Sequence, residues 1–236
     1  MRILLHKADT RGLADHDWLL SRHTFSFAGY YDESRMGFGA LRVINDDVVQ
    51  PGFGFGTHSH SNMEIVSIPL AGSLRHQDSM GNTQLIQHGE VQIMSAGRGI
   101  SHSEYNGSDS EIVNFLQIWV LPKRQNIEPR YEQKQFSANE RQNRFQTVVS
   151  PDAESDAVWI NQDAWFSLGD YEAGLPGVYT VQRIGNQAYF FVLDGTITIA
   201  GERLSRRDGL GVEDLESIDF DIHEDCQLLV MDVPVE

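Results

Sequence analysis

The chain has very little cysteine and no long apolar run. Its one cysteine, Cys226, cannot form an internal disulfide and suits a reducing cytoplasm. Residues 1–7 reach charged side chains too early for a secretory signal peptide. No stretch approaches the roughly 20 apolar residues that a membrane-spanning helix needs. We therefore expect a cytoplasmic protein that does not cross a membrane.

Positive charge is also scarce. The 18 Lys and Arg residues face 34 Asp and Glu residues, which gives a formal net charge of −16. Nucleic acids and anionic membranes bind basic surfaces, so we expect neither as a direct partner. The chain has 236 residues, of which 40% are hydrophobic, and it can therefore bury a sizeable core in one large domain or two small ones.

Two short clusters place metal-binding residue types at alternate positions. His58 and His60 form the first cluster, and His102 and Glu104 form the second. Alternate side chains of a β-strand share a face, so each cluster would point two ligands the same way, about 6.5 Å apart. Strands facing each other across a small barrel would bring three imidazoles and one carboxylate to one ion. Such nitrogen and oxygen ligands suit Fe, Ni, Cu, Mn or Zn.

The glycines around these clusters favour a metal site over isolated polar histidines. Gly52 precedes the first cluster, Gly72 ends the strand after it, and Gly89 opens the apolar stretch before the second. This order resembles the paired motifs of cupins. Two spacings depart from that pattern, because Gly72 falls one residue late and His102 follows Gly97 by five residues rather than three. The set as a whole predicts a cupin fold.

Outside these motifs the chain reads as short strands separated by turn residues. Residues 41–47 are expected to form a strand that runs into a turn. In the second half, Asp194-Gly195 and Ala200-Gly201 are expected to form turns between strands. The strands expected there are 158–160, 165–168, 178–181, 189–193, 196–199 and 228–233. This spacing indicates an all-β sandwich or barrel.

A polar stretch separates the two sets of strands. Residues 136–146 are expected to link an N-terminal barrel of residues 1–135 to a C-terminal barrel of residues 147–236. A short helix is expected at residues 136–142, with Ser137 near its cap.

The two halves resemble a divergent internal repeat. When Gly72 is aligned with Gly195, non-ligand residues of the second half fall opposite the first cluster and Glu64. These residues are Val181 for His58, Arg183 for His60 and Gln187 for Glu64. His223, the one histidine after residue 147, is expected to be a strand-end residue. We therefore expect one metal ion, in the first barrel.

Several longer strings resemble bacterial pirins. They are His23-Thr24-Phe25-Ser26-Phe27, residues 38–47, 76–82 and 94–100, and Pro129-Arg130-Tyr131-Glu132. The resemblance implies a bicupin, with two jelly-roll-like cupin barrels in tandem and a metal in the first. It also implies that His58, His60, His102 and Glu104 hold one divalent ion. Fe(II) is the first expectation, and Cu, Ni, Co, Mn and Zn are alternatives.

The resemblance also implies an activity. Several pirins are similar to quercetin 2,3-dioxygenases, which open a flavonol ring with O2, so we expect such an enzyme acting on a small aromatic substrate. Flavonol cleavage requires loss of the 3-hydroxyl proton, and Glu104 is the obvious base at the centre. The alternative is a metal-dependent, redox-sensing regulatory module that binds a protein partner, as in a eukaryotic branch of the family. We expect a monomer.

Four other residues have expected supporting roles. Glu64 occupies a position that many cupins use as a ligand but pirins usually do not, so we expect it either to support the ligands from behind or to belong to the core. Gln117 is expected to face the cavity, where its amide needs a partner. His23 is expected to make a structural hydrogen bond. His76 is expected to help fix a hairpin.

Overall fold

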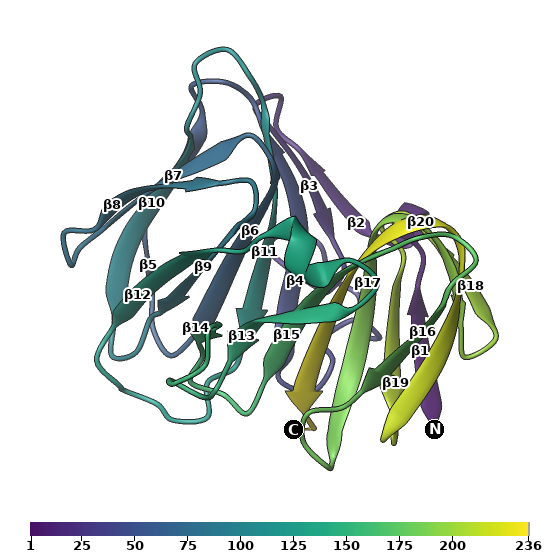
Figure 1. The fold of residues 1–236 in the computed structure, drawn as a ribbon. Helices are drawn as coiled ribbons and strands as arrows, with labels where there is room; N and C mark the ends of the chain where they lie inside the picture. The colour runs from purple at the N-terminus through teal and green to yellow at the C-terminus, as the bar shows by residue number, and fades with distance from the viewer. Residues whose placement is uncertain (236) are drawn as a thin grey trace.

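The computed structural model describes residues 1–235, which fold into two β-sandwich halves lying side by side (Figure 1). Three sheets of antiparallel and, at one pairing, parallel strands account for nearly all of the regular structure. The expectation of an all-β bicupin is confirmed. Among the described residues, no helix is long and apolar enough to span a membrane.

The N-terminal half contains two sheets that pack face to face. The first has the order β12-β9-β6-β11-β4-β3-β2 and the second has the order β5-β10-β7-β8. The strands of the first are β2 (Gly12–Asp15), β3 (Leu19–His23), β4 (Leu41–Val49), β6 (Glu64–Ala71), β9 (Glu90–Ser95), β11 (Val113–Val120) and β12 (Arg130–Gln135). Those of the second are β5 (Gly54–His60), β7 (Ser73–Asp78), β8 (Thr83–Gln87) and β10 (Ile100–Asn106).

Apolar side chains from both of these sheets close one end of the sandwich. The buried cluster there includes Val49 on β4, Leu74 on β7 and Phe115 on β11. Along β10, every second residue from Ile100 to Asn106 is buried, as expected for a strand with one face toward a core. This alternation turns the side chains of His102 and Glu104 toward the interior.

The C-terminal half contains the third sheet, with the order β1-β19-β17-β20-β15-β13-β14, and with β16 and β18 paired to β20 and β17. Its strands are β1 (Arg2–His6), β13 (Phe145–Ser150), β14 (Val158–Trp159), β15 (Trp165–Tyr171), β16 (Pro176–Thr180), β17 (Asn186–Ile199), β18 (Glu202–Ser205), β19 (Gly209–Glu213) and β20 (Ser217–Pro234). Two 3-10 turns complete the regular structure, η1 (Ala8–Thr10) and η2 (Ala138–Arg141). A continuous apolar core joins the halves, with Val66, Leu116, Phe166 and Leu229 among its members.

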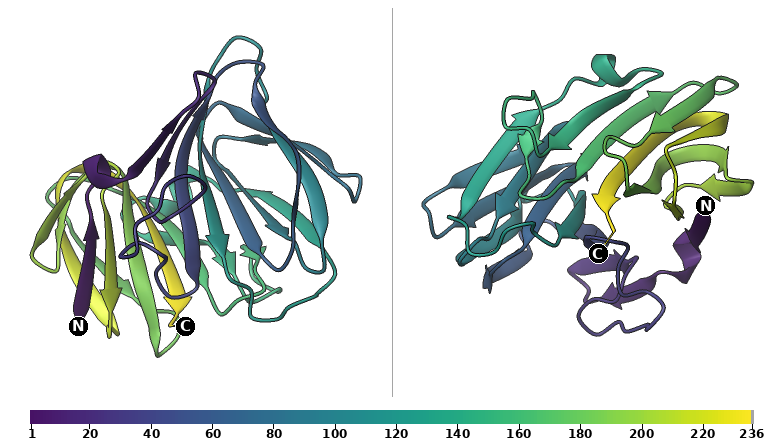
Figure 2. Two further views of the ribbon diagram at one scale, coloured as in Figure 1. Left: turned by 180° about the vertical axis from the view of Figure 1, so that it is seen from behind. Right: turned by 90° about the horizontal axis from the view of Figure 1, so that it is seen from below.

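The first strand differs from the expected domain division. β1 pairs along its whole length with β19, so residues 2–6 belong to the C-terminal sheet although they were expected in a barrel of residues 1–135 (Figure 2). Leu4 packs against the core between the halves and Leu5 against the core of the C-terminal half. The chain then crosses to the N-terminal half, which ties the two together.

Three local expectations were also wrong. Asp194-Gly195 forms no turn, because β17 continues through it with irregular pairing to β20 on both sides. The strand expected at residues 41–47 does not turn there but runs on to Val49. The short helix is a single 3-10 turn, and Ser137 precedes it without a side-chain cap. At Asp194-Gly195 a β-bulge accommodates the positive φ of 87° at Gly195, so the strand continues.

Candidate metal centre

The two expected clusters lie on neighbouring strands. β5 and β10 are antiparallel partners in one sheet, and His58 stands directly opposite His102. The expectation that the clusters would face each other across a barrel is therefore wrong. Residues paired across neighbouring strands can still bring both clusters to one ion, because their side chains project from the same face of the sheet.

Three imidazole rings form a tight cluster. The ring centroids of His58 and His102 are 4.4 Å apart, and that of His60 lies 4.8 and 4.9 Å from them. The potential ligand nitrogens of the three lie within 4.8 Å of one another. Two atoms bound to one ion at about 2.1 Å are at most about 4.2 Å apart, so small side-chain shifts suffice to bind one ion.

The protonation state of these rings suits metal binding. Burial lowers the pKa of His60 to about 4, and the charge of His58 adds to the effect. Burial also lowers the pKa of His102 to about 2, with His58 and His60 contributing. Both rings are therefore neutral near pH 7 and keep a lone pair for a ligand bond.

The free ring nitrogens fit a metal as well. Both nitrogens of His102 are buried and have no hydrogen-bond partner within residues 1–235. A buried polar atom without a partner is costly, and an ion would satisfy one of these. Nδ1–H of His58 donates to the carbonyl of Gly56 at 2.8 Å, which fixes the ring and leaves Nε2 as the ligand atom.

Glu104 is held beside this cluster. Its side chain belongs to a second possible ligand group with His76 and His102, and not to the group of three histidines. Ser67 Oγ donates to Oε1 at 3.2 Å, and Gln117 Nε2 donates to Oε2 at 2.6 Å. Burial raises the pKa of Glu104. The amide of Gln117 thus has the partner that its inward position requires.

His76 is the neighbour that the sequence did not reveal. It shares a bond of 3.1 Å with Asp78, whose carboxylate also accepts from the backbone of the following turn, so the expected hairpin contact is confirmed. β7 also pairs with β10, and His76 stands opposite Glu104. Its ring lies 5.3 Å from that of His102. Only the pairing of these strands could have shown this.

Glu64 lies outside both groups. Its Oε2 accepts hydrogen bonds from Ser95 Oγ at 2.7 Å and from the backbone N–H of Asn161 at 3.1 Å. Burial raises the pKa of Glu64 to about 7. Asn161 belongs to the C-terminal half, so this carboxylate joins the two halves.

A cavity of about 460 Å³ opens beside the histidines. Its aromatic walls are Trp18, Phe27, Phe55 and Trp119. The indole of Trp119 meets the ring of His60 edge-on at 4.9 Å. A planar aromatic molecule can therefore lie against these rings next to the candidate ligands.

In the part of the chain that the structure describes, both possible ligand groups lie in the N-terminal half. Arg183, at the position aligned with His60, forms an ion pair with Asp163. His223 was expected at the end of a strand, but it lies within β20, where it is exposed and bonds to the hydroxyl of Thr198. These contacts give neither residue a role at a metal.

Two sandwiches, the first with a histidine cluster against an aromatic cavity, define a bicupin with one candidate metal centre. The Pirin model matches residues 6–120, and a model described as the quercetinase C-terminal cupin domain matches residues 147–233. The chain belongs to the pirin family.

Known proteins match this sequence over almost its whole length. A protein named quercetin 2,3-dioxygenase from Escherichia coli K12 is 46% identical, covering 98% of this chain and 99% of its own length. A pirin-like protein from Caulobacter vibrioides is 39% identical, with 95% and 96% covered. The crystal structure of the E. coli pirin YhhW in complex with nickel(II) is 43% identical, covers 100% of both chains and superposes with a TM-score of 0.94.

Proposed function

We propose that this chain is a metal-dependent dioxygenase that opens quercetin or a similar flavonol with O2. The observation that carries the proposal is the cluster of His58, His60 and His102. Both ring nitrogens of His102 lack a hydrogen-bond partner within residues 1–235, and His58 and His60 line an aromatic-walled cavity of about 460 Å³. That volume lies in the range typical of sites for small organic ligands. The relatives named quercetin 2,3-dioxygenase support the reaction class.

His58, His60, His102 and Glu104 are the proposed ligands of one divalent ion. Fe(II) is our first choice, and the nickel(II) complex of the E. coli pirin makes Ni(II) the next ion to test. When bound, the ion supplies positive charge that stabilises an ionised substrate oxygen and lowers the pKa of its hydroxyl.

The protein's own residues hold the substrate in place and orient the proposed ligands. The aromatic walls exclude water and hold the flavonol plane, so substrate and ion meet at little entropic cost. Gln117 fixes the Glu104 carboxylate through the bond at 2.6 Å, and the Gly56 carbonyl fixes the ring of His58. As a ligand, Glu104 would be the catalytic carboxylate that offsets part of the ion's positive charge next to the reacting oxygen.

The test is aerobic turnover of quercetin by protein loaded with each of several ions. We expect loss of flavonol absorbance with matching O2 consumption, abolished by chelation and in His102→Ala. His223→Ala is the matched control, because it removes an exposed imidazole from the C-terminal half, and it should keep full activity. Turnover no faster than with free metal across the whole panel would reject the dioxygenase and favour the regulatory alternative.

A further inference from the structure

The cavity wall contains a second carboxylate that the proposed function does not use. Asp47 lies on β4, is 2% exposed, and lines the same cavity as His58 and Glu104. β4 belongs to the seven-stranded sheet, whereas the histidines come from the four-stranded sheet that packs against it. Asp47 therefore faces the substrate space from the wall opposite the histidine cluster.

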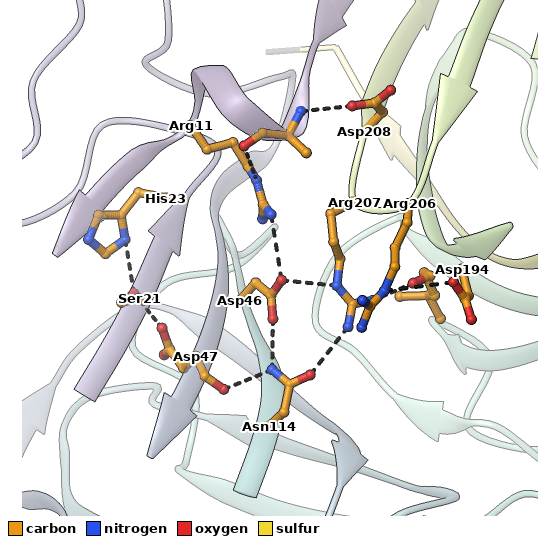
Figure 3. Close-up of polar contacts among 12 residues, drawn as sticks. Arg11, Ser21, His23, Asp46, Asp47, Asn114, Asp194, Arg206, Arg207 and Asp208 are labelled. Carbon is orange, nitrogen blue, oxygen red and sulfur yellow. Dashed lines mark hydrogen bonds and ion pairs between the residues drawn. The ribbon is translucent and has the colours of Figure 1, made fainter. Parts of the chain in front are cut away.

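The neighbouring aspartate shows what a purely structural role looks like here. Asp46 points out of the cavity and forms ion pairs with Arg11 at 3.5 Å and Arg207 at 3.0 Å (Figure 3). Asn114 Nδ2 also donates to it, at 2.8 Å. The charge of Asp46 is thus balanced by two arginines between the halves. Asp47, on the other face of β4, forms no ion pair within residues 1–235.

Asp47 is held by a short chain of neutral groups. The hydroxyl of Ser21 donates to its Oδ1, and within residues 1–235 no other side chain donates to this carboxylate. Ser21 Oγ lies 3.3 Å from Nδ1 of His23 (Figure 3). The same Nδ1 is 2.8 Å from Oδ1 of Asn45. Because Asn45 Oδ1 is an acceptor, Nδ1 of His23 carries the proton. The second oxygen of Asp47 is left for a ligand.

We propose that Asp47 accepts the proton of the enolic hydroxyl of the substrate, and that Ser21 and His23 are its positioning residues. The inference deepens the proposed function and rests on it. In this step the substrate O–H bond breaks, the proton moves to the free oxygen of Asp47, and the electron pair stays on the substrate oxygen. The product is an enolate and a neutral carboxylic acid, and no oxidant is consumed.

The surroundings favour Asp47 over Glu104 for this task. Both oxygens of Glu104 accept hydrogen bonds, from Ser67 and Gln117, and the proposed ligation adds a further demand on them. The pKa of Asp47 is raised to about 7, mainly by burial and in smaller part by the charges of Asp46 and Glu104, while the hydrogen bond from Ser21 opposes the rise. A base with a pKa near the working pH is the most effective.

The other titratable groups that line this cavity are His16, His23, His58, His60 and Glu104. On β3, burial lowers the pKa of His23, which makes its ring a weaker base than the Asp47 carboxylate. On β5, His58 and His60 are proposed ligands. The side chains that β11 turns into the cavity, Gln117 and Trp119, are both uncharged.

The first experiment uses zinc-loaded protein under nitrogen, so that binding is seen without oxidation. Quercetin bound to the unmodified protein should show the absorbance of its anion, whereas Asp47→Asn should bind it in the neutral form. The asparagine side chain is the same size and can still accept from Ser21, so the fold and the zinc content should be unchanged. Asp219→Asn removes an exposed carboxylate of β20 that does not line the cavity, so it is the control variant and should bind the anion.

The second experiment is turnover with the active ion. Asp47→Asn should lower kcat by about 10²- to 10⁴-fold with little change in KM, which is the usual contribution of a general base. The rise of kcat through about pH 7 should disappear, and Asp47→Glu should restore part of the rate. Ser21→Ala should move that rise to higher pH, because it removes the hydrogen bond that stabilises the carboxylate.

The outcomes separate the two proposals. Full turnover and an anionic flavonol in Asp47→Asn reject the role of Asp47 and leave the dioxygenase intact. An anionic flavonol that depends on Asp47, without any O2 consumption, rejects the dioxygenase and supports the proton acceptor. A protein that binds no flavonol rejects both.

Discussion

Replacing Glu64 with glutamine tests both the ligand set and the electrostatics of the buried core. The Glu64 side chain is fully buried, and burial raises its pKa from 4.5 to about 7. The unfolded chain releases this proton near pH 4.5, whereas the folded chain holds it to about pH 7. Folding therefore carries no cost from Glu64 at low pH, and a growing cost as pH rises between the two values.

The size of that cost follows from the shift. A shift of about 2.5 pKa units corresponds to about 3.4 kcal/mol at 1.36 kcal/mol per unit. Glutamine cannot ionise, so the variant lacks this cost at every pH. The new amide N–H group of glutamine is buried, which lowers the free energy of unfolding by about 1–3 kcal/mol. This loss is the same at each pH. The stability of Glu64→Gln relative to the parent should therefore rise by about 2–3 kcal/mol between about pH 5 and pH 8.

The assay is urea unfolding of both proteins at several pH values, with metal content measured alongside. We expect the variant to keep its ion, because Glu64 contacts Ser95 and Asn161 and lies outside both ligand groups. A stability difference that stays flat across this pH range would refute the raised pKa. Loss of the ion in Glu64→Gln, with retention in Glu104→Gln, would refute the ligand set.

Three further predictions concern the metal centre and the C-terminal half. Elemental analysis should find close to one divalent ion per chain, reduced in His58→Ala and unchanged in His223→Ala; two ions, with only one lost, would contradict the single site. Glu104→Gln should retain metal less well under dialysis, because it loses a proposed ligand charge. Chelation should leave hydrogen-exchange protection of residues 158–233 unchanged, since neither ligand group lies there, and broad loss of protection would count against a metal-free scaffold.

The alternation of residue types was enough to find the two ligand pairs, because side chains two apart on a strand share a face. Local spacing alone could pair His58 with His60 and His102 with Glu104, and the cupin-like order of the motifs then joined the two pairs. Which strands are neighbours is not local information. The place of His76 next to His102 depends on the pairing of β7 with β10, and the place of residues 2–6 depends on the pairing of β1 with β19.

Asp47 was missed for a different reason. Adjacent Asn and Asp residues usually mark turns, so residues 45–47 favoured the end of a strand. In the structure all three are buried within β4, because distant residues satisfy them. Arg207 on the far half pairs with Asp46, and Ser21 on β3 bonds to Asp47. Tertiary contacts of this kind override local preference and leave no trace in the strand itself.

The same contacts explain how a half without metal ligands supports the site. Arg207 is 3.0 Å from Asp46 on β4, and the backbone of Asn161 is 3.1 Å from Glu64 on β6. Both strands belong to the sheet that packs against the candidate ligands. A buried carboxylate that loses its partner costs several kcal/mol, so the C-terminal half fixes these two strands where they stand. Asp47 is the next residue after Asp46, and the ion pair between the halves thereby also sets the position of the proposed proton acceptor.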